Sequence, residues 1–469
     1  MNMTPVIDVF TDAFRKSMIE HCDFSGEEEL TPGIAARFFA AMGKSMSHAA
    51  CVGTKQFLMS HDVDEPFIVR NGVRLNRTQP VSKEFLIPFG KIELERQNFQ
   101  AYWGGESYQP LDEKWGMVGE FATESVRECI LFYTAHLSPT EIVNCLSKSS
   151  LFHPSKTAID NILKETGERT EAHFERIHST MLTQTPIPEK PDVIVGSMDG
   201  ANILTREPGI KKGRPSERPK DDIKTSAHSS YRNVMTGSFS QYRAADSEHD
   251  HQRIGASYIS RSPEENFPTF RENFEREFTW YRERFGTDTP FVLLHDGGRN
   301  IWKYCDENPL FQDCLKLLDF YHATEHLSWA AEAIFGKQSQ SAKQWYRKWK
   351  SKLKDSDGGA QCLIRSMEYY QPKIRGKTRR ENLERELTFF RRNAERMDYK
   401  SFRDKGFPIG SGPVEAACKT IVKDRLCKSG QRWSLDGAQH ILHLRAIVKS
   451  GRWESYWKEQ EEIRLELCA

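Results

Sequence analysis

The chain has 469 residues, 28% of them charged, and a formal net charge of only +1. This length allows two to four domains with at least one sizeable core, and the small net charge excludes a uniformly basic protein without excluding a local basic surface. No run of about twenty apolar residues occurs, which excludes a membrane-spanning helix, and the first residues lack the pattern of a secretory signal. We therefore expect a cytoplasmic protein.

The charged residues are unevenly distributed along the chain. An acidic stretch at 26–30 offsets basic runs at 211–214, 343–354 and 373–380. Each basic run is explained either by solvated surface or by DNA contact, and the second explanation requires the runs to share one face.

The first 190 residues fall into two segments. Residues 1–115 alternate a helical piece (32–46) with short strand-like ones (67–70 and 84–88), and they contain no motif of known chemistry, so their role is left unknown. Residues 116–190 are helical and contain two capped helix starts, at Ser138 and Ser155.

These two starts predict short helices joined by a turn. Such a pair is either an ordinary helical hairpin or a helix-turn-helix, whose second helix enters the major groove of DNA. In the helix-turn-helix case, Ser155, Lys156 and Thr157 lie near the leading end of that second helix and would contact DNA.

A proline-rich linker at 183–191 marks a boundary, after which the segment 191–322 has a different character. Strands and helices follow there in an order that suits a mixed sheet with helices on both faces. We predict strands at 193–199, 231–243, 253–260, 291–294 and 315–318, a loop rich in Pro, Lys and Arg at 207–224, and an amphipathic helix at 263–285.

Two further segments complete the chain. Residues 323–403 are helical and charged, with aromatic anchors and no convincing strand, which predicts an all-helical insertion into the core. Residues 404–469 form the second part of the core and end in helices, predicted at 413–428 and 435–459.

Aspartates close two of the predicted strands. Asp199 ends the strand at 193–199, Asp296 follows the strand at 291–294, and each precedes a glycine that lets the backbone turn sharply. Carboxylates at strand ends suit Mg²⁺, which prefers hard oxygen ligands. Each aspartate taken alone is also a common turn signal.

A third carboxylate, Glu415, follows a glycine-rich turn and a helix start at Pro413. Lys419 and Lys423, one and two turns on, share its helix face and could meet DNA phosphates. Glu415 either joins the two aspartates or only complements the helix dipole. Three such carboxylates could hold the two metal ions, about 4 Å apart, that phosphodiester transfer uses.

Four motifs carry a resemblance to a known family. They are Ser-Met-Asp-Gly at 197–200, Leu-His-Asp-Gly-Gly at 294–298, Asp-Phe-Tyr-His at 319–322, and Gly-Ser-Gly-x-x-Glu at 410–415 with Ser-Gly-x-Arg-Trp at 429–433. They resemble the DDE transposases of bacterial insertion sequences, especially the ISKra type. The resemblance covers about residues 116–450, and its last block is the most specific.

The resemblance implies a fold and a site. The fold is α/β: a ribonuclease-H-like mixed sheet with flanking helices, interrupted by the all-helical insertion and preceded by a mostly helical DNA-binding region. The implied catalytic and metal-binding triad is Asp199, Asp296 and Glu415, with two Mg²⁺ or Mn²⁺ ions. The DNA-contacting residues of the last block are Lys419, Lys423, Arg425, Arg432 and Trp433.

The motif of Asp319 and His322 is implied to lie near the active site, and its role is left open. His322 either orients Asp319, or orients a DNA strand, or is a satisfied core histidine, whereas His326 is expected to be structural.

One departure from the family concerns the cysteines. Relatives often carry an N-terminal zinc-binding cysteine cluster, but the ten cysteines here are scattered, without a Cys-x-x-Cys pair. We expect reduced, mostly structural thiols, and zinc-dependent recognition of transposon ends is put in doubt.

The expected activity is that of a transposase, with metal-dependent cleavage at terminal inverted repeats and strand transfer into target DNA. Its partner is double-stranded DNA, and pairing of two ends implies a homo-oligomer. Two alternatives stay open: a ribonuclease-H-like nuclease that only cuts, and a catalytically inactive, transposase-derived DNA-binding protein.

Overall fold

The structure is a computed structural model that describes residues 3–22, 29–149, 152–186, 189–206, 231–246 and 250–468. Contacts divide the chain into two compact units, Met1–Ile177 with Glu454–Ala469, and His178–Trp453. The division falls just ahead of the proline-rich linker expected at 183–191. The basic run at 211–214, within the loop expected at 207–224, lies outside the described residues. No helix among the described residues has the length and apolarity needed to cross a membrane.

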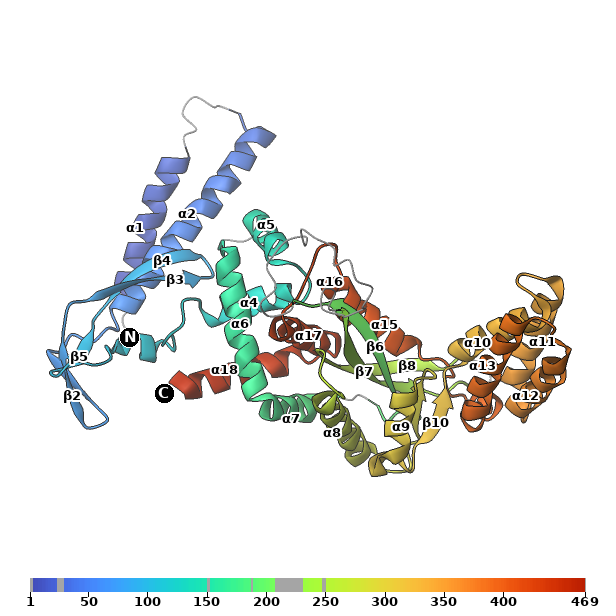
Figure 1. Ribbon diagram of the computed structural model, residues 1–469. Helices are drawn as coiled ribbons and strands as arrows, with labels where there is room; N and C mark the ends of the chain where they lie inside the picture. The colour runs from blue at the N-terminus through green and yellow to red at the C-terminus, as the bar shows by residue number, and fades with distance from the viewer. Residues whose placement is uncertain are drawn as a thin grey trace, which may run out of the picture. The chain divides into compact units, whose positions relative to one another are not determined.

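The first unit opens with two long helices that pack against each other, α1 (Thr4–His21) and α2 (Pro32–Met59) (Figure 1). More strand follows than the sequence indicated. An antiparallel sheet forms from β1 (Phe67–Arg70), β2 (Val73–Arg77) and β5 (Phe99–Ala101), and a hairpin forms from β3 (Val81–Ile87) and β4 (Gly90–Arg96). Asn71 and Gly72 both have positive φ, which fits the two-residue turn between β1 and β2.

The helices expected after residue 116 are confirmed. They are α4 (Glu124–Thr134), α5 (Pro139–Ser149) and α6 (Lys156–Ala172), and each contacts the other two. Ser138 and Glu141 form a reciprocal capping box at the start of α5, and the Ser155 hydroxyl accepts the Ala158 N–H at the start of α6. The short α3 (Pro110–Lys114) precedes them, and α7 (Phe174–Gln184) follows.

The second unit is built on a five-stranded mixed sheet in the order β10-β9-β6-β7-β8. Three long strands are antiparallel neighbours, and β9 and β10 run parallel to β6. The strands are β6 (Val193–Leu204), β7 (Tyr231–Arg243), β8 (Gln252–Arg261), β9 (Phe291–His295) and β10 (Leu315–Leu318). The predicted mixed α/β fold is confirmed at this level.

Residues alternate between the two faces of β6, and a separate core covers each face. Ile194 and Met198 join the aromatic side chains of α8 (Pro268–Phe285), while Val193 and Val195 join the core of the helices that follow β10. The helix α8 begins at Pro268 rather than near 263. Between β9 and β10 lie α9 (Arg299–Glu307) and a short 3₁₀ turn, η1 (Pro309–Phe311).

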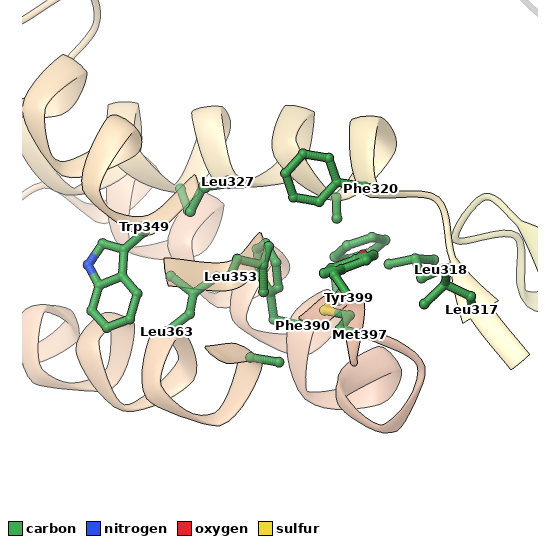
Figure 2. Close-up of a cluster of buried hydrophobic side chains, with 14 of the residues drawn as sticks. Leu317, Leu318, Phe320, Leu327, Trp349, Leu353, Leu363, Phe390, Met397 and Tyr399 are labelled. Carbon is green, nitrogen blue, oxygen red and sulfur yellow. The ribbon is translucent and has the colours of Figure 1, made fainter. Parts of the chain in front are cut away.

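The segment expected at 323–403 is helical throughout, and its core is continuous with the sheet. Its helices are α10 (Phe320–Phe335), α11 (Gln340–Asp355), α12 (Gly359–Tyr370), α13 (Lys377–Asn393) and α14 (Tyr399–Asp404), with short 3₁₀ turns η2 (Gln371–Lys373) and η3 (Ala394–Arg396). Figure 2 shows Phe320 and Tyr399 between Leu317 and Leu318 of β10 and the deeper bundle core around Phe390. The bundle and the sheet therefore share one core rather than meeting as separate bodies.

The C-terminal segment differs from the single helix expected at 435–459. It forms α17 (Leu435–Lys449) and α18 (Trp453–Cys468), separated by a turn in which Gly451 has a φ of 67°. The turn directs the buried Arg452 guanidinium onto Glu277 of α8, with bonds of 3.0 and 2.6 Å. His178 and Ser257 also contact the Glu277 carboxylate, which is fully buried. Helix α7, strand β8 and the end of α17 are thus joined through one buried carboxylate.

Replacing Glu277 with Gln should strongly destabilise the protein. The change leaves the buried Arg452 guanidinium without its counter-charge, and breaking such a pair costs about 3–5 kcal/mol. Chemical denaturation measures the loss. Glu272→Gln is the matched control, because Glu272 lies on the same helix in an exposed pair with Arg276 and should change stability by less than about 0.5 kcal/mol. Equal stability of the two variants would contradict the prediction.

Candidate active site

Asp199 lies within β6, near the point where this strand leaves β9. The parallel pairing of β6 with β9 ends at Gly196 and Leu293, and Asp199 pairs only with Thr236 of β7. The prediction that Asp199 closes the strand is wrong, since β6 continues to Leu204. Gly200 therefore makes no turn. Its missing side chain leaves room for Asn233, whose amide would lie 2.5 Å from an added Cβ.

Asp296 immediately follows β9, as predicted. Its Oδ1 accepts the Gly298 N–H at 2.9 Å, and its carbonyl accepts the Trp302 indole N–H at 2.6 Å. Gly297 has a packing role, because an added Cβ would collide with the Phe389 ring of α13. The close approach of the insertion to the Asp296 loop thus requires glycine at this position.

His295 joins the backbone segments that carry the two aspartates. The Met198 N–H, one residue before Asp199, donates to His295 Nδ1 at 3.0 Å, and His295 itself precedes Asp296. Burial lowers the pKa of His295 to about 3, so the ring is neutral and its Nδ1 can accept. This hydrogen bond replaces strand pairing where β6 and β9 diverge.

Both aspartates line one pocket of about 480 Å³. Burial raises the pKa of the Asp199 carboxyl above its ordinary value, and the negative charge of Asp296 contributes to the rise. The Gly200 N–H, the Cys418 thiol and Lys423 act in the opposite direction on this pKa. Asp296 is therefore close enough to disfavour the charged form of Asp199, an effect that a bound cation would relieve.

The helix that carries Glu415 packs against β6 and β7. It begins as α15 (Gly412–Ala417), continues as a π-helical segment, η4 (Cys418–Lys423), and ends as α16 (Asp424–Leu426). The Cys418 thiol is buried beside Asp199 and Thr236, and its burial together with the charge of Asp199 raises its pKa well above the ordinary value. Buried Arg445 of α17 donates to the carbonyls of Thr420 and Ile421, which supports the π-helical turn.

Glu415 is not brought together with the two aspartates. Its side chain is exposed, its Oε1 accepts the Ser411 hydroxyl at 3.2 Å, and it does not line the pocket. Across the residues that the structure describes, no three His, Cys, Asp or Glu side chains are arranged to hold a metal ion. Glu415 nevertheless lies one helical turn before Cys418, the residue that contacts Asp199.

Asp319 holds the turn that precedes Glu415. The Asp319 carboxylate is 1% exposed and accepts the backbone N–H groups of His322, at 2.6 Å, and of Ser411, at 2.5 Å. Ser411 in turn donates its hydroxyl to Glu415. The motif resemblance implied that Asp319 lies near the site. In the structure its carboxylate fixes the glycine-rich turn through the Ser411 N–H.

The two histidines that follow Asp319 have different surroundings. The His322 ring is partly exposed, and its Nδ1 lies 3.7 Å from the Glu325 carboxylate. The contact of His322 with Asp319 is made by its backbone N–H. His326 pairs with the buried Glu386 at 2.5 Å and stacks on Phe389, which agrees with the structural role expected for it.

Six of the residues expected to contact DNA are exposed. They are Ser155, Lys156 and Thr157 at the start of α6, and Lys419, Lys423 and Arg432. Arg425 differs from this expectation, because it is buried and its guanidinium lies 5.1 Å from the Trp433 ring centroid. Trp433 is partly buried and donates its indole N–H to the Leu426 carbonyl, and its backbone pairs with the end of β6. Both residues thus close the end of α16 against the sheet.

Two contacts in the site were not predicted from the sequence. Cys418 follows Glu415 by three residues, a spacing that places both on one helix face, but a lone cysteine gave no chemical signal. His295 stands inside the Leu-His-Asp-Gly-Gly motif, and its contact with Met198 depends on the three-dimensional divergence of two strands.

Comparison with known proteins gave matches among solved structures. No protein-family model matches the chain, and no curated protein matches it. Among solved structures, the Drosophila P element transposase strand transfer complex matches with a TM-score of 0.36 and 10% sequence identity, over 70% of this chain and 92% of that chain.

His295→Gln should remove part of the acid sensitivity of the fold. The pKa of His295 is about 3 in the folded protein against an ordinary 6.5, so the unfolded ring takes up a proton first. The resulting stability is present above pH 6.5 and is lost as the pH falls toward 3. Between pH 7 and pH 5, urea denaturation should show a loss about 2 kcal/mol larger for wild type than for the variant.

The exposed His251 provides the control for this measurement. His251→Gln should retain the wild-type dependence on pH, since its ring is open to solvent. An unchanged pH dependence in His295→Gln would show that His295 is not held neutral by the fold.

Proposed function

We propose that the chain is a DNA transposase of the DDE type, on a ribonuclease-H-like core, which cleaves DNA at transposon ends and joins them to target DNA. The observation that carries the proposal is the placement of Asp199 and Asp296 in one pocket where β6 and β9 diverge. The helix bearing Glu415 packs against β6 and β7 beside this pocket and contacts Asp199 through Cys418. The motif resemblance supports the same reading of these residues.

The strand order supports the choice of core. An antiparallel trio, β6 to β8, continues into two parallel strands through helical connections, and the two aspartates lie where β9 ends beside β6. The insertion enters after β10 and returns the chain at the glycine-rich turn before Glu415. This order accounts for the long separation of Asp296 from Glu415 in the sequence.

Two Mg²⁺ or Mn²⁺ ions are the group that these carboxylates would hold. The donor set fits in part: Asp199 and Asp296 offer hard oxygens, and the pKa of Asp199 is raised first by its burial and then by the neighbouring negative charge of Asp296. Glu415 would complete the set by exchanging its bond to Ser411 for the metal site. When bound, such ions stabilise the charge on the attacking and leaving oxygens.

The reaction would proceed in two displacements at phosphorus. Water attacks the phosphodiester at the transposon end and the 3′ oxygen leaves, which frees a 3′ hydroxyl. That hydroxyl then attacks a target phosphodiester, and the target's own 3′ oxygen leaves the phosphorus as a free 3′ hydroxyl. The residues of the chain contribute chiefly by fixing positions: His295 sets the spacing of the two aspartates, and Asp319 sets the turn before Glu415.

The proposal includes DNA contacts and assembly. Lys419, Lys423 and Arg432 are exposed near the helix of Glu415 and would meet phosphates, and the exposed start of α6 would meet transposon ends. Holding two ends in one complex requires more than one copy of the chain.

The triad is tested by Asp199→Asn, Asp296→Asn and Glu415→Gln. Each should lower magnesium-dependent cleavage of DNA carrying the terminal inverted repeats by about 1,000-fold or more, since a lost metal ligand removes several kcal/mol of transition-state stabilisation. The exposed Asp313 is the matched control, and Asp313→Asn should cleave normally.

Pre-cleaved ends separate the transposase from its alternatives. A transposase joins them to target DNA, a nuclease gives no joined product, and a catalytically inactive binding protein gives neither cleavage nor joining. Full cleavage by all three triad variants would contradict the assignment of the site.

A second experiment compares Arg432 with Arg425. Arg432→Gln should weaken DNA binding at any sequence and reduce by about one the slope of log affinity against log salt concentration, because one phosphate contact is lost. Arg425→Gln should instead lower the free energy of unfolding, because Arg425 is buried against Trp433. If the slope of log affinity against log salt concentration were reduced in Arg425→Gln and unchanged in Arg432→Gln, the placement of the DNA-binding surface at Arg432 would be contradicted.

A further inference from the structure

The pocket beside the aspartates extends well beyond them. Asp199 and Asp296 share it with residues from the start of α8 and from α9. Its floor is apolar, formed in part by the buried Met198, Met235 and Phe270. A volume of about 480 Å³ exceeds what metal ions require and falls in the range that organic ligands occupy.

Two arginines also line this pocket. Arg271 of α8 lies over the Tyr304 ring, with its guanidinium carbon 4.7 Å from the ring centroid, and Arg299 stands exposed at the start of α9. In the described part of the chain, neither arginine has a carboxylate within ion-pair distance. Cations without counter-ions beside an apolar floor suit a ligand that carries both an anion and a flat apolar group.

The pocket wall contains a strained aromatic residue. Asn266 and Phe267 have φ angles of 57° and 53°, a left-handed conformation that is a rare outlier for phenylalanine. The Phe267 carbonyl accepts the Arg271 N–H at 3.0 Å, so the strain sets the first turn of α8 and brings Phe267 and Arg271 to one wall. Such strain often accompanies a binding function.

A second hollow continues the first. Phe267, Arg271, Asn300 and Tyr304 line both, and the second has a volume of about 590 Å³ and reaches Lys303 at the surface. A chain of linked groups could therefore enter along α9 and end beside the aspartates.

We propose that this pocket receives one nucleotide of the DNA strand, displaced from the base stack beside the scissile phosphate. The base would lie on the apolar floor against Phe267, and Arg271 and Arg299 would bind the adjoining phosphates. Asn233 and Asn300 line the same pocket and offer amide groups to the base edge. The inference rests on the proposed function and adds a specificity-determining subsite to it.

The test uses the full chain and terminal DNA in which 2-aminopurine replaces, in turn, each nucleotide on either side of the scissile phosphate. Binding is measured without divalent metal, so that fluorescence reports unstacking and not cleavage. Wild type should raise the fluorescence at one position, whereas Arg271→Gln and Phe267→Gly should abolish most of the rise. Arg284→Gln, an exposed change at the far end of α8, should behave as wild type.

An abasic nucleotide at the responding position supplies the second measurement. Arg271→Gln and Phe267→Gly should cleave intact DNA about tenfold or more slowly, as expected when one base–aromatic contact is lost, but should approach the wild-type rate on the abasic substrate. Equal impairment on both substrates would overturn the proposal, as would unchanged fluorescence at every position with a wild-type protein that cleaves.

The same proteins distinguish two further outcomes, the failure of the proposed function and the binding of a free nucleotide. Wild type that neither cleaves nor joins DNA would overturn the proposed function itself, and this inference with it. Free deoxynucleoside monophosphates should not bind in equilibrium dialysis. Binding that Arg271→Gln abolishes would assign the pocket to a free nucleotide and overturn its assignment to DNA.

Discussion

The divergence of β6 from β9 is the constraint on which the site depends. Up to Gly196 the two strands are joined by parallel pairing, and beyond it β6 continues with β7 as its partner. The hydrogen bond from Met198 to His295 spans the opening, and it places Asp199 and Asp296 on either side of it. A neutral, buried histidine is needed there, because a charged ring could not accept that N–H.

Two features of the structure border this opening, a helix on one side and a pocket on the other. The helix of Glu415 approaches from β7 and contacts Asp199 through Cys418, and Asp319 fixes the start of that helix through Ser411. The pocket with its two arginines opens toward α8 and α9. Asp199 and Asp296 therefore lie between a basic, exposed helix on one side and a partly apolar pocket on the other. This arrangement agrees with the proposed binding of DNA.

Periodic patterns in the sequence predicted what depends on local structure. The strands ending near Asp296 and Asp319 and the all-helical insertion follow from runs and periods of apolar residues, and the structure contains them. Arg425 is buried against Trp433, which pairs with the end of β6, and the break at Gly451 precedes the contact of Arg452 with Glu277. Both features depend on segments far along the chain, so the local pattern could not indicate them. The convergence of Glu415 with the aspartates was expected from motif order, and the structure instead holds Glu415 on Ser411.

Gly297 lies where the insertion packs against the loop of Asp296. The Phe389 ring of α13 occupies the space that a side chain at this position would fill, and Arg392 of the same helix donates to the Gly297 carbonyl at 3.0 Å. One ring contact and one hydrogen bond thus join α13 to the loop of Asp296. A displacement of the helical bundle would be transmitted through them to the backbone beside Asp296.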